Sequence, residues 1–196
     1  MSSFLLFCVA PVPSSTIDAL LQTPRHNFFS LVRDSTQSNF DPWCTSPPVA
    51  PFNSDFSGRD QIRTFLAEHI SVPPKGSDLE SRQYAILDER SATDRTVILG
   101  HSYSSLLMRD LETMTEDEAD QWQIECDEYE GEEDDSRREW RVKFEDADAL
   151  STILCFEGDF TPKVYNDEFI AIYTDAEGVF QLEPAYRAYA GAALPN

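Results

Sequence analysis

The stretch YAILDERSATDRTVIL, residues 84–99, decides the fold class of this chain. It begins and ends with short apolar runs, residues 84–87 and 96–99, that have the length and composition of buried strands. The link between them, residues 88–95, is polar and contains the turn-forming residues Ser, Thr and Asp. We therefore predict two sheet strands in this stretch.

The N-terminal part of the chain continues this alternation of apolar runs and breakers. Residues 4–10 and 27–33 are predicted strands, and a helix between them begins at Ser14 or Ser15 and ends at the Thr23-Pro24 pair. Residues 34–56 carry four prolines among Ser and Asn, which indicates a long surface loop.

A second helix is predicted to begin at Ser57. Its apolar residues recur at helical spacing, Asp60 suits the first turn, and the Pro73-Pro74 pair ends it. The apolar residues at this spacing are Ile62, Phe65, Leu66 and Ile70.

An acidic segment follows the central strands. Eight of the eleven residues from 125 to 135 are acidic. Apolar residues alternate with polar ones on both sides of it, which predicts a β-hairpin with an acidic tip. The alternating residues are Trp122, Ile124 and Cys126 before the tip, and Trp140, Val142 and Phe144 after it.

The C-terminal part is predicted to hold two helices and a closing strand. Asp146 or Asp148 caps the first helix, and the second runs from Thr161 toward Ile172. Residues 177–182 form the strand. The chain as a whole is predicted to be α+β, with a mixed or antiparallel sheet of about five to seven strands, about three to four helices packed on it, and an acidic hairpin insertion.

The predicted domain organisation is simple. We expect one domain over residues 1–196, with an N-terminal strand-helix extension at 1–26 and an acidic insertion at 108–138.

Charge restricts the classes of partner. Fifteen basic side chains against thirty-six acidic ones give a formal net charge of −21 at pH 7. This charge repels phosphate backbones and anionic lipid headgroups, so we expect no nucleic-acid partner and no membrane partner. It would attract a basic protein, a cationic ligand or divalent cations, although acidity also serves solubility alone.

The apolar run at residues 4–10 and the cysteines bear on the compartment. The run is too short to span a bilayer and lacks a preceding Lys or Arg, although small residues at 12–14 leave a signal peptide as the alternative. No two of the four cysteines, Cys8, Cys44, Cys126 and Cys155, have C-x-x-C spacing. We expect them to be reduced thiols. We therefore expect a cytoplasmic or nuclear location.

One motif suggests nucleophilic catalysis. Residues 100–104, Gly-His-Ser-Tyr-Ser, resemble the nucleophile elbow of α/β-hydrolases. However, Ser104 replaces the closing glycine of that motif, and no histidine follows Ser102 to act as general base. A plain strand-to-loop junction is the preferred interpretation.

Metal and cofactor motifs are absent from the sequence. His26, His69 and His101 lie on separate predicted elements, and the acidic segment lacks the ligand order of an EF-hand. The seven glycines have neither dinucleotide-binding nor Walker spacing. We expect no metal site and no cofactor.

Several short blocks, taken in order, resemble an uncharacterised domain-of-unknown-function family of small bacterial and fungal α+β proteins. The blocks are Leu31-Val32-Arg33-Asp34 followed by Trp43, residues 84–88, 91–94 and 97–99, Trp140-Arg141-Val142-Lys143, Leu150-Ser151, residues 156–160 and Gly178-Val179-Phe180. The chain departs from the family by its first 25 residues, its acidic insertion, and Ala149 in place of an expected asparagine. The resemblance implies an α+β fold in one domain and brings no activity with it.

The leading functional hypothesis is a non-catalytic binding or regulatory module whose acidic surface meets a basic protein partner. Its expected contact residues combine acidic groups at the hairpin tip with flanking aromatic residues. They are Glu128, Glu130, Glu132, Glu133, Asp134, Asp135, Trp122 and Trp140.

The alternative is a small cofactor-independent enzyme, such as an isomerase or cyclase, acting on a small apolar molecule. Such an enzyme needs only one or two acid–base groups in an aromatic pocket. The candidates by residue type and position at strand ends are His101, Asp88 and Tyr84.

Overall fold

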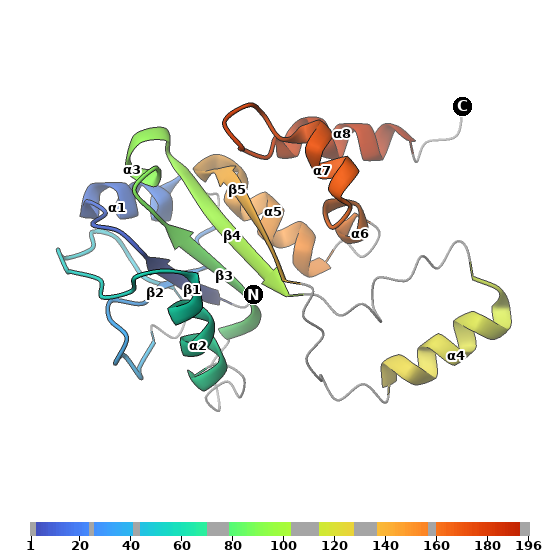
Figure 1. Cartoon of the computed structure of the whole chain (residues 1–196), viewed down its shortest axis with the longest axis horizontal. Helices are drawn as coiled ribbons and strands as arrows, with labels where there is room; N and C mark the ends of the chain where they lie inside the picture. Colours follow the sequence, from blue (N-terminus) through green and yellow to red (C-terminus); the bar gives the residue numbers. More distant parts are fainter. Residues whose placement is uncertain are drawn as a thin grey trace.

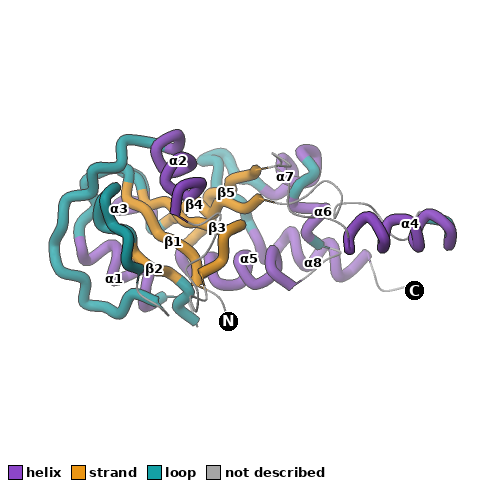
Figure 2. Tube along the Cα trace, turned by 90° about the horizontal axis from the view of Figure 1, so that it is seen from below, coloured by secondary structure: helices purple, strands orange, loops and turns teal. Residues whose placement is uncertain are grey.

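The computed structural model describes residues 3–23, 26–40, 44–69, 79–102, 114–127, 137–156 and 160–192. They form an α+β fold in which one five-stranded sheet carries helices on both faces (Figures 1 and 2). The strands are β1 (Ser3–Cys8), β2 (Phe29–Leu31), β3 (Leu79–Leu87), β4 (Thr96–Ser102) and β5 (Arg137–Lys143).

The sheet is mixed, with the strand order β2-β1-β3-β4-β5. β1 pairs in parallel with β2 and β3, whereas β3, β4 and β5 pair antiparallel. All six residues of β1 are buried, as expected for a parallel strand between two neighbours. The segment predicted as an N-terminal extension therefore supplies an inner strand of the sheet.

The described residues contain eight helices, more than the three or four predicted. They are α1 (Ser14–Gln22), α2 (Arg59–His69), α3 (Ser91–Asp94), α4 (Glu116–Asp127), α5 (Phe144–Phe156), α6 (Thr161–Val164), α7 (Asp167–Tyr173) and α8 (Leu182–Ala192). The difference arises partly because the helix predicted from Thr161 is divided in two. Asn166 interrupts it, and its side chain accepts a hydrogen bond from the Phe169 amide to begin α7.

Two hydrophobic cores lie on opposite faces of the sheet. α2 covers one face, where Ile62, Phe65 and Leu66 pack on Leu5, Phe7, Tyr84, Ile86 and Ile98. On the other face, α1, α5 and α8 contribute Ile17, Leu20, Leu150, Leu154, Leu182 and Ala185. The strands predicted at 84–87 and 96–99 and the helix carrying Ile62 are confirmed; Ile70 lies outside the described residues.

The predicted acidic hairpin is not confirmed, because the residues expected to form its first strand lie in a helix. Trp122 and Ile124 belong to α4, which begins with a capping box. The Glu118 carboxylate accepts hydrogen bonds from the Thr115 amide and hydroxyl, both at 2.8 Å, and the Thr115 hydroxyl oxygen lies 3.4 Å from the Glu118 amide. Three acidic residues in the first turn add favourable interactions with the helix dipole.

The return strand of that hairpin does exist as β5, with Trp140 and Val142 buried. Phe144 lies one residue beyond it and begins α5, two residues earlier than the predicted cap at Asp146. The predicted tip, residues 128–135, lies outside the described residues.

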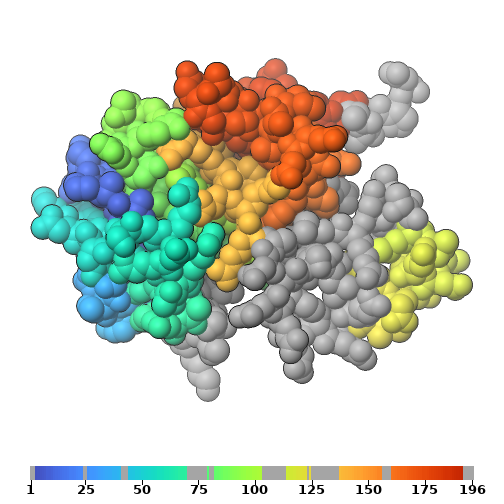
Figure 3. All heavy atoms as spheres, viewed as in Figure 1, coloured from blue at the N-terminus to red at the C-terminus, as the bar shows by residue number. Residues whose placement is uncertain are grey.

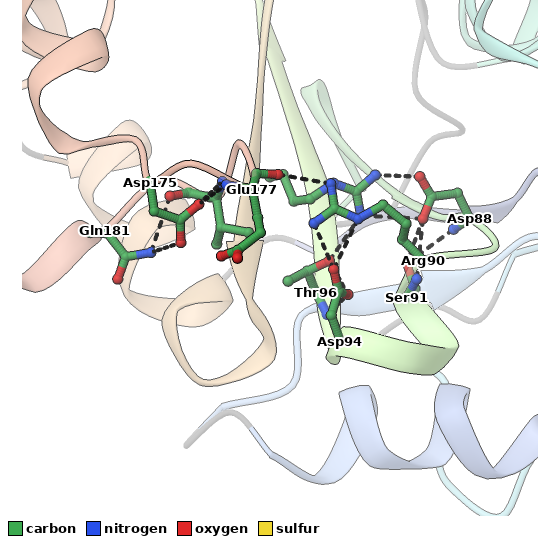
Figure 4. Close-up of polar contacts among 10 residues, drawn as sticks. Asp88, Arg90, Ser91, Asp94, Thr96, Asp175, Glu177 and Gln181 are labelled. Carbon is green, nitrogen blue, oxygen red and sulfur yellow. Dashed lines mark hydrogen bonds and ion pairs between the residues drawn. The ribbon is translucent and has the colours of Figure 1, made fainter.

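The predicted closing strand at 177–182 is wrong. Only an isolated bridge between Thr174 and Phe180 forms there, and α8 begins at Leu182. Asp175 directs the chain into a turn, since its carboxylate accepts hydrogen bonds from the amides of Glu177 and Val179 and from the Gln181 side chain (Figure 4). No helix among the described residues is both long enough and apolar enough to cross a membrane.

Candidate functional site

Two of the three catalytic candidates of the sequence, Tyr84 and His101, lie on opposite faces of the sheet. Tyr84 lies opposite Gly100 in the antiparallel β3–β4 pair, and His101 lies opposite Gln83. Neighbouring residues of a strand point to opposite faces, and Tyr84 indeed packs in the core on the α2 side while His101 contacts Tyr165 on the other side. Tyr84 and His101 therefore cannot act on one substrate from the same face of the sheet.

Asp88 follows β3 and is held by an ion pair to Arg141 of β5. Arg141 donates two hydrogen bonds to the carboxylate and a third to the Thr96 hydroxyl, at 2.8 Å. Burial alone would raise the pKa of Asp88, but the hydrogen bonds and charge of Arg141, with hydrogen bonds from Ser91, lower it below its usual value. Asp88 therefore stays ionised and is a poor general base.

A second ion pair extends this cluster to the C-terminal part of the chain (Figure 4). Arg90 donates to the Asp94 carboxylate at 2.7 and 3.0 Å and to the Glu177 carbonyl at 3.0 Å. Asp94 in turn accepts hydrogen bonds from the amide and hydroxyl of Thr96. These contacts join the β3–β4 connection to the turn before α8, which is a structural role.

Arg141→Met should lower the free energy of unfolding by about 2 kcal/mol, because the Asp88 carboxylate loses its partner. The value lies below the range for fully buried pairs, since the Arg141 and Asp88 side chains are 11% and 24% exposed. Urea unfolding would measure it. Arg187→Met, which breaks a pair exposed at 77% and 71%, is the matched control and should change stability by less than about 0.5 kcal/mol.

A double variant tests the pairing itself. If Asp88 and Arg141 interact as described, Asp88→Asn combined with Arg141→Met should cost less than the sum of the two single changes. Strict additivity would contradict the interaction.

Tyr84 lies against a strand position that lacks a side chain. A Cβ added at Gly100 would stand 2.1 Å from the Tyr84 ring, so glycine is required there. The Tyr84 hydroxyl donates to Glu139 of β5 at 3.0 Å, and Arg59 of α2 donates to the other oxygen of that carboxylate. Burial, then the Glu139 charge and this hydrogen bond, raise the pKa of Tyr84 far above its usual value, so it remains protonated.

His101 is buried between the sheet and the C-terminal helices. The Tyr165 hydroxyl donates to the His101 carbonyl at 3.0 Å, and its oxygen lies 2.9 Å from His101 Nδ1. Burial, followed by the charge of Arg82, lowers the pKa of His101 to about 4. The imidazole is therefore neutral at physiological pH.

Neighbouring polar groups on this face also satisfy one another. Gln83 of β3 donates to the Ser151 carbonyl at 3.2 Å and to Cys155 Sγ at 3.0 Å, and the Ser151 hydroxyl donates back to the Gln83 side chain at 2.5 Å. This group is not among the sites expected from the sequence. The position of Gln83, two residues before Ala85 on the same strand face, is the signal that places it in the core.

The predicted binding residues are divided by the structure. Trp140 is 2% exposed and donates its indole hydrogen to the Val164 carbonyl at 3.1 Å, so it belongs to the core. Trp122 is half-buried on α4. The six acidic residues predicted for the tip, Glu128, Glu130, Glu132, Glu133, Asp134 and Asp135, lie outside the described residues.

Among the described helices and strands, α4 has the largest net charge per residue. Its twelve residues include six acids and no base, and Glu116, Asp117 and Asp120 are exposed. Ile124 is 51% exposed. In both backbone views, the cartoon and the tube, α4 lies apart from the sheet (Figures 1 and 2). Acidic and apolar groups on α4 are thus accessible to a partner.

Metal ligation has no support among the residues that the structure describes, where no group of three or more His, Cys, Asp or Glu side chains could hold an ion. The histidines are used elsewhere: His26 lies 3.5 Å from Asp148, and His69 stacks on Phe65. Cys8 is buried, which raises the pKa of its thiol to about 12 and keeps it protonated.

Comparison of the chain with protein-family models, with curated proteins and with solved structures finds no match in any of the three.

Proposed function

We propose that this chain is a non-catalytic binding module that meets a basic protein through the acidic helix α4. The observation that carries the proposal is the combination of six acids and no base on a helix that lies apart from the sheet. Because the carboxylates of Glu116, Asp117 and Asp120 are exposed, a cationic group of a partner can reach them. Such a surface steers oppositely charged partners and raises their association rate.

Two further properties of α4 suit recognition. The capping box between Thr115 and Glu118 stabilises the helical conformation before binding, which reduces the entropy lost in a complex. Ile124 supplies an apolar contact beside the charges. The helix takes the place of the expected hairpin as the partner-binding element.

The catalytic alternative receives less support. Asp88, Tyr84 and His101 are each held by internal partners, namely Arg141, Glu139 and Tyr165. Tyr84 and His101 lie on opposite faces of the sheet, and no observation favours a reaction at any of the three residues.

Neutralising α4 tests the proposal with a labelled oligolysine peptide as the basic probe. The triple variant Glu116→Gln, Asp117→Asn, Asp120→Asn should weaken binding roughly tenfold, because each lost charge removes about 0.5 kcal/mol of attraction. Fluorescence anisotropy at low salt would measure the affinity. Circular dichroism would check that α4 persists, since Thr115 and Glu118 are unchanged.

The matched control removes equal charge elsewhere. Glu68→Gln, Glu89→Gln and Glu145→Gln change three exposed acids outside α4. This control should weaken binding only about twofold, through the long-range field alone. Equal losses in the two triple variants would show that net charge, and not α4, attracts the probe, and would refute the proposal.

A further inference from the structure

α7 has the composition of a core helix, but none of its residues is fully buried: Phe169, Ile170 and Tyr173 pack partly buried against the core, and Ile172 is exposed. Four of its seven side chains are large and apolar or aromatic, namely Phe169, Ile170, Ile172 and Tyr173. Ile172 is 72% exposed. The segment that contains α6 to α8 is the orange-red surface at the top of the space-filling view (Figure 3). Exposed large apolar side chains beside partly buried aromatic rings can mark an interaction site.

The apolar residues here are held in place by one another. Phe160, fully buried, packs against Phe169, Tyr186 and Tyr189 with ring centroids 6.0, 5.3 and 5.0 Å away. Phe169 in turn packs against Tyr173 at 4.8 Å. We call Phe169, Ile172, Tyr173, Tyr186 and Tyr189 the α7–α8 patch. Because these contacts order the four rings of the patch in advance, a partner would bind them without a large entropic cost.

The net charge of the segment that carries the α7–α8 patch indicates what kind of partner fits it. Residues 160–192 contain five acids and two bases, a local net charge of −3. The acids are Asp167, Glu168, Asp175, Glu177 and Glu183, and the bases are Lys163 and Arg187. Arg187 is paired with Glu183, and Arg138 of β5 is paired with Asp167, so Arg138 reduces the local net charge from −3 to −2. A positively charged occupant is therefore favoured over a second copy of this chain or an anionic membrane.

We propose that the α7–α8 patch docks the apolar stripe of a basic amphipathic helix belonging to a partner protein. Leucine-type side chains of that helix contact Ile172 and the neighbouring rings, and its flanking Lys or Arg side chains face the surrounding acids. The inference rests on the proposed function, because it gives the same basic partner an apolar anchor away from α4.

The test uses a labelled helical peptide with a leucine stripe flanked by lysines. Ile172→Asp places a charge in the α7–α8 patch and should weaken binding of this peptide roughly tenfold or more, the effect of losing one buried aliphatic contact. Binding of oligolysine should stay equal or become slightly tighter, because the variant is more acidic. Weaker binding of both probes, or of neither, would overturn the inference.

Thr64→Asp on α2 is the control, since it adds the same charge at an exposed helix position that belongs neither to α4 nor to the α7–α8 patch. It should leave leucine–lysine peptide binding within about twofold of the unaltered protein. If Ile124→Asp weakens binding and Ile172→Asp does not, the apolar anchor lies on α4 and the inference fails while the proposed function stands. Loss of oligolysine binding in the α4 charge variant reports on the proposed function alone.

Two measurements guard against misleading results. Thermal unfolding should be unchanged in Ile172→Asp, because the side chain is mostly exposed. Independently of any variant, amide chemical shifts of the unaltered protein should move on α7 and α8 when the leucine–lysine peptide is added. Shifts confined to other elements, or a dimer in sedimentation that Ile172→Asp abolishes, would overturn the inference.

Discussion

Replacing Gly100 by alanine should lower the free energy of unfolding by about 3 kcal/mol, the upper part of the range for overpacked cores. The new methyl group would stand 2.1 Å from the Tyr84 ring, far inside van der Waals contact. Tyr84 is a rigid ring, 3% exposed, and cannot yield without leaving the core on the α2 side. Its hydrogen bond to Glu139 would be lost with that movement.

Urea unfolding of Gly100→Ala would measure this effect, with Gly191→Ala as the matched control. Gly191 lies in α8, where an added Cβ meets nothing within 4 Å, so alanine there should be neutral or stabilise by up to about 1 kcal/mol. In a Tyr84→Ala background the additional cost of Gly100→Ala should largely disappear. A Gly100→Ala protein as stable as the unaltered one would contradict the described contact.

The second large effect is a loss of stability in mild acid caused by His101. Its pKa is about 4 in the folded protein against an ordinary value of 6.5. Below pH 6.5 the unfolded chain therefore binds a proton that the folded protein does not accept until about pH 4. The contribution of His101 to the free energy of unfolding should fall by about 3 kcal/mol as the pH is lowered through this window.

His101→Gln isolates this contribution, since carboxylates that titrate in the same range cancel when the two proteins are compared. The stability difference between His101→Gln and the unaltered protein should shift in favour of the variant as the pH falls from 6.5 toward 4. Chemical denaturation at several pH values would measure it, and an NMR titration would give the imidazole pKa directly. A pH-independent difference, or an imidazole that titrates near 6.5, would refute the prediction.

Local sequence patterns predicted a helix or strand correctly where the spacing of apolar residues and the positions of Pro, Gly and other breaking residues indicated the same element. The helix carrying Ile62, Phe65 and Leu66 and the strands around residues 84–87 and 96–99 formed as expected. Each of these depends on side chains a few residues apart, whose spacing decides which face is buried.

α4 shows how a local signal can be overlooked. The alternation of Trp122, Ile124 and Cys126 suggested a strand, but the Thr115-Glu-Asp-Glu118 sequence before it is a capping box. Helical start signals outweigh three alternating residues, because capping satisfies backbone amides that would otherwise lack partners. The helix could thus have been predicted from the residues that precede it.

The polar sites could not have been predicted in this way. Asp88 and Arg141 are 53 residues apart in the chain, and His101 and Tyr165 are 64 apart. Residue type marked Asp88 and His101 as candidates, but only their partners reveal that one is a paired anion and the other a neutral core group. The resemblance to an uncharacterised α+β family, which stays a prediction, carries no site that would have helped.

By itself, the sequence determined the charge of −21, the class of secondary structure and the identity of most buried strands and helices, because these follow from composition and short-range spacing. The position of β1 inside the sheet, the opposite faces of Tyr84 and His101, and the exposure of Ile172 on α7 follow from the tertiary structure alone. The physical reason is that strand order and side-chain pairing depend on the free energy of contacts between distant segments. That free energy includes the entropy of closing the loops between them and is not encoded in any local window.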